Sequence, residues 1–137
     1  MEILYTAKVT TSGGRNGHVK SSDGIIDMDV RMPKGLGGQN DNYPNPELFF
    51  GAAYSACYDG ALNLVARMER FKITSTTTAN VSIGKVEDGS LAISVVLDID
   101  VQGVDKETAQ KLIEKAHQVC PYSKAIRNNV NVVLNLL

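Results

Sequence analysis

The sequence has few of the features that mark secreted, metal-binding or nucleic-acid-binding proteins. It has two cysteines and no tryptophan in 137 residues, and it contains no Cys-x-x-Cys motif. Two distant cysteines make neither a disulfide framework nor a structural zinc site, so we expect no metal. The 14 basic and 15 acidic residues leave a net charge of −1 without a basic run. We therefore expect no nucleic acid and no anionic membrane among the partners.

Long charge-free apolar runs are also missing. None reaches the length that a membrane-spanning helix requires. The first residues have neither the basic start nor the apolar run of a signal peptide, so we expect a cytoplasmic location. The length predicts one domain, over residues 1–137.

The stretch from Asn45 to Met68 predicts one long helix. Asn45 can cap its first turn, Pro46 suits the first helical position, and Glu47 lies where the helix dipole favours an anion. Apolar residues face nearly every direction around this helix, which is typical of a buried helix. One sheet can cover only one side of it. We therefore expect a second copy of the chain to cover the other side, as a homodimer.

Hydrophobic alternation and turn residues predict the remaining elements. Strands are expected over residues 3–10, 18–21, 25–30, 73–86, 91–101 and 130–137, and helices over residues 105–119 and 121–127. The strands are grouped and do not alternate with helices. The fold class is therefore predicted to be α+β, with a largely antiparallel sheet packed on the long central helix.

Cys57 lies near the middle of the long helix, and the apolar residues around it allow two interpretations. It is either a small apolar residue in a core stripe or a reactive thiol beside an apolar pocket. At 100° per residue, its face also holds Phe50, Ala53, Tyr54, Ala61, Leu64 and Met68. Such a face suits an alkyl chain. We expect Leu64 and Met68 to pack in the core instead, and we place Phe50, Ala53 and Tyr54 in a substrate pocket.

Cys120 lies where one predicted helix ends and Pro121 begins the next. Backbone N–H groups at a helix start favour a thiolate, so Cys120 is either reactive or a buried structural residue. Two cysteines on ordered elements suggest a peroxide-reducing pair, in which a sulfenic acid condenses with a second thiol. The thiolate would need a cation, which an arginine supplies, and a buried arginine needs a carboxylate. Local sequence alone makes Arg15 a solvated residue of a hairpin turn.

Five short motifs follow one another along essentially the whole chain. They are Gly13-Gly14-Arg15-Asn16-Gly17, Ser22-Asp23-Gly24, Asn45-Pro46-Glu47, Ala56-Cys57-Tyr58-Asp59-Gly60-Ala61-Leu62 and His117-Gln118-Val119-Cys120-Pro121-Tyr122-Ser123. Together they resemble the organic hydroperoxide resistance proteins, the peroxidase branch of the osmotically inducible protein C (OsmC) superfamily. The resemblance implies an OsmC-like fold and an intertwined homodimer.

The resemblance also implies an activity and a set of site residues. It implies a thiol peroxidase that reduces organic hydroperoxides, including those of fatty acids, to alcohols. Cys57 would be the peroxidatic cysteine and Cys120 the resolving one, while Arg15 would activate the Cys57 thiolate and Glu47 would orient Arg15. No bound cofactor is implied, because dihydrolipoamide on lipoylated proteins would reduce the Cys57–Cys120 disulfide. The alternatives are a thiol redox sensor and a broader OsmC-type peroxidase on the same fold.

Helix geometry restricts how these residues can meet. Glu47 and Cys57 lie ten positions apart, about 15 Å along an unbroken helix. Either the helix breaks, for example near Gly51, or each site takes Glu47 and Arg15 from the partner subunit, which we expect. Asp59 points away from Cys57, so we assign it no catalytic role. The two histidines, His18 and His117, are expected to be structural or to face solvent.

Overall fold

The computed structural model describes residues 1–137. The chain forms two compact units, residues 1–49 and residues 50–137. The expectation of a single domain over the whole chain stays a prediction. No helix has the length and hydropathy that crossing a membrane requires.

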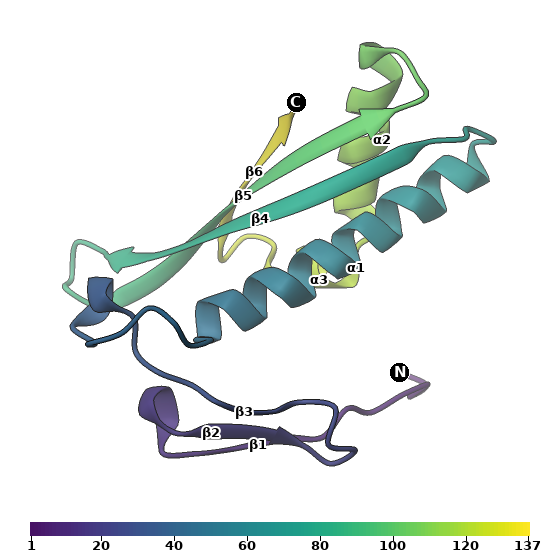
Figure 1. The fold of residues 1–137 in the computed structure, drawn as a ribbon. Helices are drawn as coiled ribbons and strands as arrows, with labels where there is room; N and C mark the ends of the chain where they lie inside the picture. Colours follow the sequence, from purple (N-terminus) through teal and green to yellow (C-terminus); the bar gives the residue numbers. More distant parts are fainter. The chain divides into compact units, whose positions relative to one another are not determined.

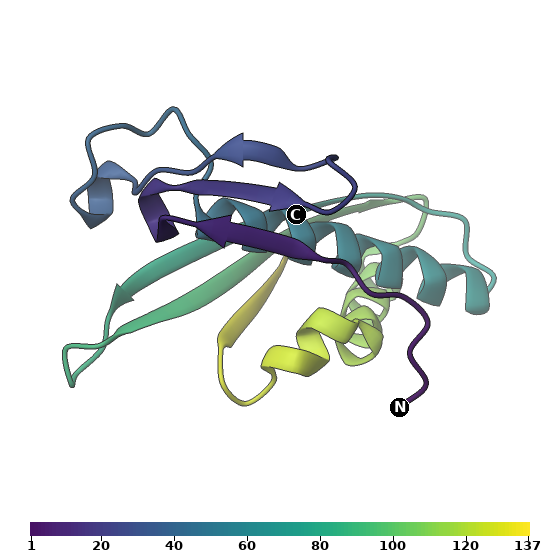
Figure 2. The ribbon, with the colours of Figure 1, turned by 90° about the horizontal axis from the view of Figure 1, so that it is seen from below.

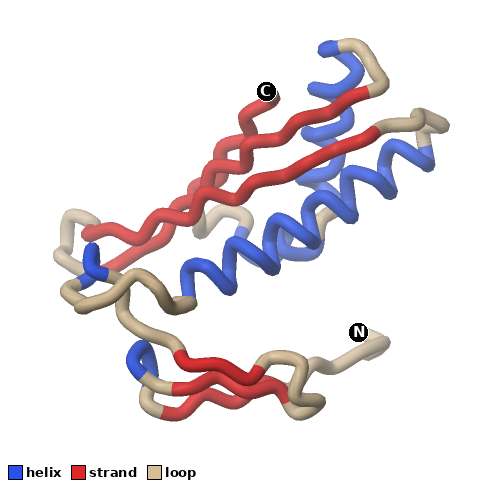
Figure 3. The backbone as a smooth tube through the Cα atoms, in the orientation of Figure 1, coloured by secondary structure: helices blue, strands red, loops and turns tan.

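The first unit is built on a three-stranded antiparallel meander (Figures 2 and 3). Its elements are β1 (Val9–Ser12), η1 (Gly14–Asn16), β2 (His18–Ser21), β3 (Asp27–Asp29) and η2 (Lys34–Leu36). Only one apolar side chain of this unit, Val30, is buried. The unit is therefore held mainly by backbone hydrogen bonds, turns and ion pairs.

The strand expected over residues 3–10 starts later than predicted, at Val9. Val9 pairs with Ser21, after which the Ser22–Gly24 turn leads the chain away from β1. Ile3 and Tyr5 therefore have no neighbouring strand, and both side chains are exposed. Alternation shows that a segment can form a strand, but the strand forms only where a partner lies beside it.

The second unit combines helices with a second three-stranded sheet, in the order β4-β5-β6 (Figure 1). Its elements are the greater part of α1 (Pro46–Met68), with β4 (Thr74–Lys85), β5 (Leu91–Gln102), α2 (Lys106–Val119), α3 (Pro121–Ile126) and β6 (Asn131–Leu136). The predicted helices and long strands are confirmed to within two residues at each end.

The single sheet that the strand order suggested is wrong, because the chain has two sheets. Pairing is largely antiparallel, as predicted, but β6 runs parallel to β5. Parallel neighbours need a long crossover connection, and α2 with α3 supplies it. Grouped strands in the sequence therefore concealed one β-α-β unit.

The core of the second unit lies between one face of its sheet and the helices α1 and α2 (Figures 1 and 2). Alternate residues of β5 are buried on this face, namely Val95, Leu97, Ile99 and Val101. The buried residues of α2 recur at helical spacing, namely Ala109, Leu112, Ile113 and Ala116. Burying apolar side chains of this size contributes about 1.5–3 kcal/mol each, so packing holds this unit together.

The helix α1 is continuous from Pro46 to Met68, so the alternative of a break near Gly51 is wrong. Gly51 is buried against β4, where a Cβ atom would lie 3.4 Å from a methyl group of Val81. The expectation that Leu64 and Met68 pack in the core is also wrong, because their side chains are 45 % and 74 % exposed. A side of this apolar helix thus remains uncovered by the second unit.

Candidate functional site

Glycines shape the turn that carries Arg15. Gly13 and Gly14 adopt φ values of 75° and 59°, a region that glycine enters without steric cost. At Gly17, a Cβ atom would collide with the carbonyl oxygen of Ser12. The sequence around Arg15 therefore specifies one tight turn between β1 and β2. This turn fixes the position of the Arg15 backbone, from which the side chain extends.

Arg15 and Glu47 form a two-point ion pair within the first unit. The Nη1 group of Arg15 donates to Oε2 of Glu47 at 2.9 Å, and Nη2 donates to Oε1 at 2.7 Å. This hydrogen bonding holds the pKa of Glu47 below its ordinary value and raises the pKa of Arg15. Glu47 itself is fixed in the first turn of α1, which Asn45 caps through its side-chain oxygen. The pair presents a charged, oriented guanidinium with further N–H donors free.

The two cysteines meet inside the second unit. Sγ of Cys120 lies 3.7 Å from Sγ of Cys57, although 63 residues separate them in the sequence. Both are free thiols, and Cys120 is fully buried while Cys57 is half-buried. A disulfide requires an S–S distance of about 2.05 Å, so a small shift would join them. The prediction that one thiol can reach the other is consistent with this geometry.

The environment of Cys57 does not by itself favour a thiolate. Burial raises the pKa of the Cys57 thiol, and the neighbouring thiol of Cys120 raises it further. The backbone N–H of Tyr122 opposes this by hydrogen bonding to Cys57, which lowers the pKa. No lysine or arginine is among the causes of this shift. A cation placed beside Cys57 would lower its pKa and favour the thiolate at neutral pH.

Aromatic side chains of α1 and α3, the helices next to the cysteine pair, pack against one another. Phe50 packs edge-to-face on Tyr54, with ring centroids 5.9 Å apart, and Tyr54 packs in the same way on Tyr58. The ring of Tyr122 stacks on Tyr54 at 6.2 Å. Of the residues predicted to line a substrate pocket, Phe50 and Ala53 are partly accessible, whereas Tyr54 is fully buried. Their role in binding substrate stays a prediction.

Asp59 and the two histidines lie in polar contacts of their own. The carboxylate of Asp59 accepts hydrogen bonds from Ser75 and Thr77, which links α1 to β4. His18 is exposed and lies between two carboxylates of β3. Nδ1 of His117 is buried without a hydrogen-bond partner, and burial lowers the pKa of this residue. Asp59 and His18 thus make polar contacts with neighbouring side chains, and the roles expected for all three residues stay predictions.

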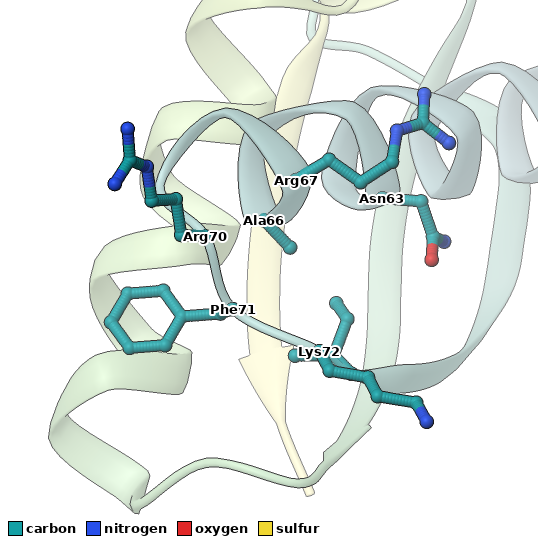
Figure 4. A pocket seen from close by; sticks show the side chains of 7 residues that line it. Asn63, Ala66, Arg67, Arg70, Phe71 and Lys72 are labelled. Carbon is teal, nitrogen blue, oxygen red and sulfur yellow. The ribbon is translucent and has the colours of Figure 1, made fainter.

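A separate cavity of about 470 Å³ lies at the C-terminal end of α1 (Figure 4). It is lined by Asn63, Ala66, Arg67, Arg70, Phe71, Lys72 and Ile73. The side chains of Arg67 and Arg70 point away from each other, and neither cysteine lines the cavity (Figure 4). No group of three or more histidines, cysteines or acidic residues is arranged to hold a metal ion. The Arg15–Glu47 pair of the first unit and the cysteine pair of the second unit therefore remain as two candidate functional groups.

Comparisons with known proteins agree along nearly the whole chain. The family described as OsmC-like protein matches residues 38–135. The chain is 46 % identical over 134 residues to organic hydroperoxide resistance protein OhrB of Bacillus subtilis, which covers 97 % of this chain and 98 % of that protein. It is 43 % identical over 137 residues to an organic hydroperoxide resistance protein of Xanthomonas axonopodis pv. citri, with coverage of 98 % and 96 %.

A solved structure gives the same result. The crystal structure of an organic hydroperoxide resistance protein from Elizabethkingia anophelis matches with a TM-score of 0.93 and 54 % sequence identity. The match covers 99 % of this chain and 98 % of that one. The similarity therefore includes both units of the chain.

Proposed function

Because this chain belongs to the OsmC-like family, and within it to the organic hydroperoxide resistance proteins, we propose that it reduces organic hydroperoxides to alcohols by cysteine chemistry. The observation that carries the proposal is the approach of Cys57 Sγ to Cys120 Sγ at 3.7 Å. Two free thiols at this distance, one half-buried and one buried, suit a peroxidatic and a resolving cysteine.

The first step oxidises Cys57. Its thiolate attacks the terminal oxygen of the hydroperoxide, an S–O bond forms and the O–O bond breaks. The alkoxide leaves and takes a proton to become the alcohol, while Cys57 becomes a sulfenic acid. Cys57 takes this role because it is the more accessible of the two thiols.

The second step forms the disulfide. The Cys120 thiolate attacks Sγ of the Cys57 sulfenic acid, an S–S bond forms, and hydroxide leaves and is protonated to water. A dithiol then reduces the disulfide through a mixed disulfide and becomes a cyclic disulfide itself. We propose dihydrolipoamide, carried on lipoylated proteins of the cytoplasm, as this dithiol. Its first thiol would attack the sulfur of Cys57, since Cys120 is fully buried.

Arg15 supplies the missing cation in this account. The second unit raises the pKa of Cys57, so a guanidinium beside the thiolate is needed to keep it charged. The two-point pair with Glu47 leaves the guanidinium oriented and with donors free for an anion. Glu47 is thus a residue that orients Arg15 and makes no contact with substrate.

We further propose that Arg15 and Glu47 come from the partner subunit of a homodimer. The unbroken helix puts Glu47 about 15 Å from the Cys57 of its own chain, too far for one arginine to serve both. The exposed apolar side chains of Leu64 and Met68 would be covered by the second copy. The dimer would then complete each site and bury the uncovered side of α1 together.

The hydrocarbon part of the substrate would lie against Phe50 and Ala53. Both are partly accessible and both lie on the face of α1 that carries Cys57. An alkyl or aryl group gains free energy from such a contact, whereas hydrogen peroxide gains none. This is the reason to expect a preference for bulky organic hydroperoxides.

Peroxide consumption with dihydrolipoamide as the sole reductant tests the proposal, with cumene hydroperoxide compared against hydrogen peroxide. We expect many turnovers, a preference for cumene hydroperoxide, and no turnover after Cys57→Ser. Consumption that stops near one equivalent would show a redox sensor instead. Sustained turnover without preference for the organic peroxide would show a broader peroxidase.

A further inference from the structure

Tyr54 and Ser123 form the one side chain–side chain hydrogen bond of the chain that is fully buried. The hydroxyl oxygens lie 2.9 Å apart, and both residues have no exposed surface. Burying two hydroxyl groups is unfavourable unless each has a partner, so neither residue is there for packing alone. Phenylalanine and alanine would fill the same space without polar atoms.

This hydrogen bond links the same two segments of the chain as the contact between the cysteines. Tyr54 lies three residues before Cys57 on α1, and Ser123 lies three residues after Cys120 in the first turn of α3. The Tyr54–Ser123 bond and the Cys57–Cys120 contact therefore join the same two segments, about one helical turn apart in each.

Tyr122 strengthens this link from the intervening position. Its ring stacks on that of Tyr54, with centroids 6.2 Å apart and an interplanar angle of 21°. The first turn of α3 is thus attached to α1 by a side-chain hydrogen bond and an aromatic stack.

The short helix α3 needs such attachments. It has six residues, and Cys120 at its N-cap makes no side-chain capping bond. A helix this short is not stable by itself, so tertiary contacts must set its orientation. Since Cys120 is its N-cap, any shift of the first turn moves the sulfur.

We propose that Tyr54 and Ser123 are a positioning pair that holds Cys120 in line for attack on Cys57. The proposal rests on the proposed roles of the two cysteines. In that step Cys120 displaces hydroxide from the Cys57 sulfenic acid, and the oxidation comes from the peroxide already consumed. Tyr54 and Ser123 touch no reacting atom and move no proton, so they act only by fixing where Cys120 lies.

The test separates the two chemical steps. Reduced protein is mixed with one equivalent of cumene hydroperoxide, and dimedone traps the sulfenic acid at timed intervals for mass spectrometry. In Ser123→Ala we expect oxidation of Cys57 at about the wild-type rate. In both Ser123→Ala and Tyr54→Phe, disulfide formation should be slower by about tenfold or more, because a misplacement of about 1 Å can cost a rate about a hundredfold. The dimedone adduct should therefore accumulate.

Tyr58→Phe is the matched control. Tyr58 is also fully buried and donates its hydroxyl to the carbonyl oxygen of Ile113 at 2.6 Å, in α2 and not in α3. The substitution removes one buried hydroxyl from the same aromatic row. It should leave the rate of disulfide formation unchanged. An equal slowing in Tyr58→Phe, or no slowing in Tyr54→Phe and Ser123→Ala, would overturn the proposal.

Two further measurements test whether the two hydroxyls act through one bond and whether the effect persists without peroxide. The double variant Tyr54→Phe with Ser123→Ala leaves no unpaired hydroxyl, and it should be no slower than either single variant if both act through one bond. Equilibration with oxidised and reduced dithiothreitol measures how readily Cys57 and Cys120 pair without any peroxide. There the Tyr54 and Ser123 variants should form less disulfide than wild type, and Tyr58→Phe the same amount. If wild type consumes no peroxide, the proposed function fails while this measurement still decides on the positioning pair.

Discussion

The two units of the chain fix their functional residues by different forces. In residues 1–49 the ion pair of Arg15 with Glu47 depends on a glycine turn and on charges, and Val30 is the one buried apolar side chain. In residues 50–137 the cysteine pair lies in a continuous apolar core. The charged half of the proposed site should therefore respond to substitutions of the turn glycines and to salt concentration. The sulfur half should respond to changes in core packing.

The difference also bears on the proposed mechanism, which draws residues from both units. The apolar core that brings the sulfurs together also raises the pKa of Cys57. The polar unit keeps its arginine charged and oriented but carries no thiol. The proposed peroxidase chemistry would use both, the thiols of one unit and the guanidinium of the other.

The largest effect is expected at Cys57. Cys57→Ser should abolish peroxide consumption, because the other thiol, that of Cys120, is fully buried. Cys120→Ser should still consume one equivalent of peroxide and then stop, with the sulfenic acid detectable by dimedone. Steady-state and single-turnover assays on the two variants measure this. Sustained turnover by Cys57→Ser would refute the sulfur half of the account.

Arg15→Ala should give the next largest loss. Removing a positioned donor of this kind lowers the rate by about a hundredfold or more. Without the guanidinium the pKa of Cys57 rises, so the rate should increase with pH over a higher range than in wild type. Arg15→Lys keeps the charge but loses the two-point pairing with Glu47. Its rate of Cys57 oxidation should lie between those of wild type and Arg15→Ala. The pH dependence of the rate of Cys57 oxidation, followed by rapid mixing, distinguishes these cases.

Gly17→Ala tests whether the glycine turn fixes Arg15. The added methyl group would collide with the carbonyl oxygen of Ser12, so the first unit should lose about 2 kcal/mol of stability. Gly35→Ala is the control, since a Cβ atom there meets nothing within 4 Å. Hydrogen exchange should show loss of protection in residues 9–21 of Gly17→Ala, with the second unit unchanged. Equal behaviour of both variants would mean that the turn tolerates a side chain.

A smaller effect concerns pH and His18. Nδ1 lies 2.8 Å from a carboxylate oxygen of Asp29, and Nε2 lies 2.6 Å from one of Asp27, so the protonated ring can donate to both. These contacts raise the pKa of His18 above its ordinary value of 6.5. Their stabilisation of the meander is therefore full below about pH 6.5 and is lost as the pH rises through the raised value.

Hydrogen exchange of β2 and β3 measured between about pH 6 and pH 9 checks this, after correction for the intrinsic pH dependence of exchange. Protection should fall with rising pH in wild type and stay flat in His18→Gln. Added salt should reduce the difference, because the groups are exposed to solvent. A pH dependence that persists in His18→Gln would assign the effect to another group.

Much of the fold follows from local patterns in the sequence. The long helix, the two long strands and the cap of α2 at Asp105 were predictable, because each is set by side-chain periodicity or a capping residue. The parallel placement of β6 was not, because pairing partners depend on tertiary contacts. Residues 3–8 alternate like a strand but lack a neighbour, so periodicity overestimated β1.

The site shows the same division. The cysteine pair was expected only through the family motifs, since no local rule brings together two residues 63 positions apart. Glu47 could be placed on its helix, but its two-point contact with Arg15 depends on how the segment between them folds, with β2, β3 and η2. Nothing in the sequence marked the bond from Tyr54 to Ser123. A hydroxyl on a buried aromatic residue was the one available signal, and Tyr58 carries it too.

The most direct test of the account mixes two inactive variants, Cys57→Ser and Arg15→Ala, and allows their subunits to exchange. If each site takes its arginine from the partner, every mixed dimer has one intact site. Random exchange should then restore about a quarter of wild-type activity, since half of the dimers are mixed. Native mass spectrometry confirms that mixed dimers form. Mixed dimers that show no activity would contradict a site shared between subunits.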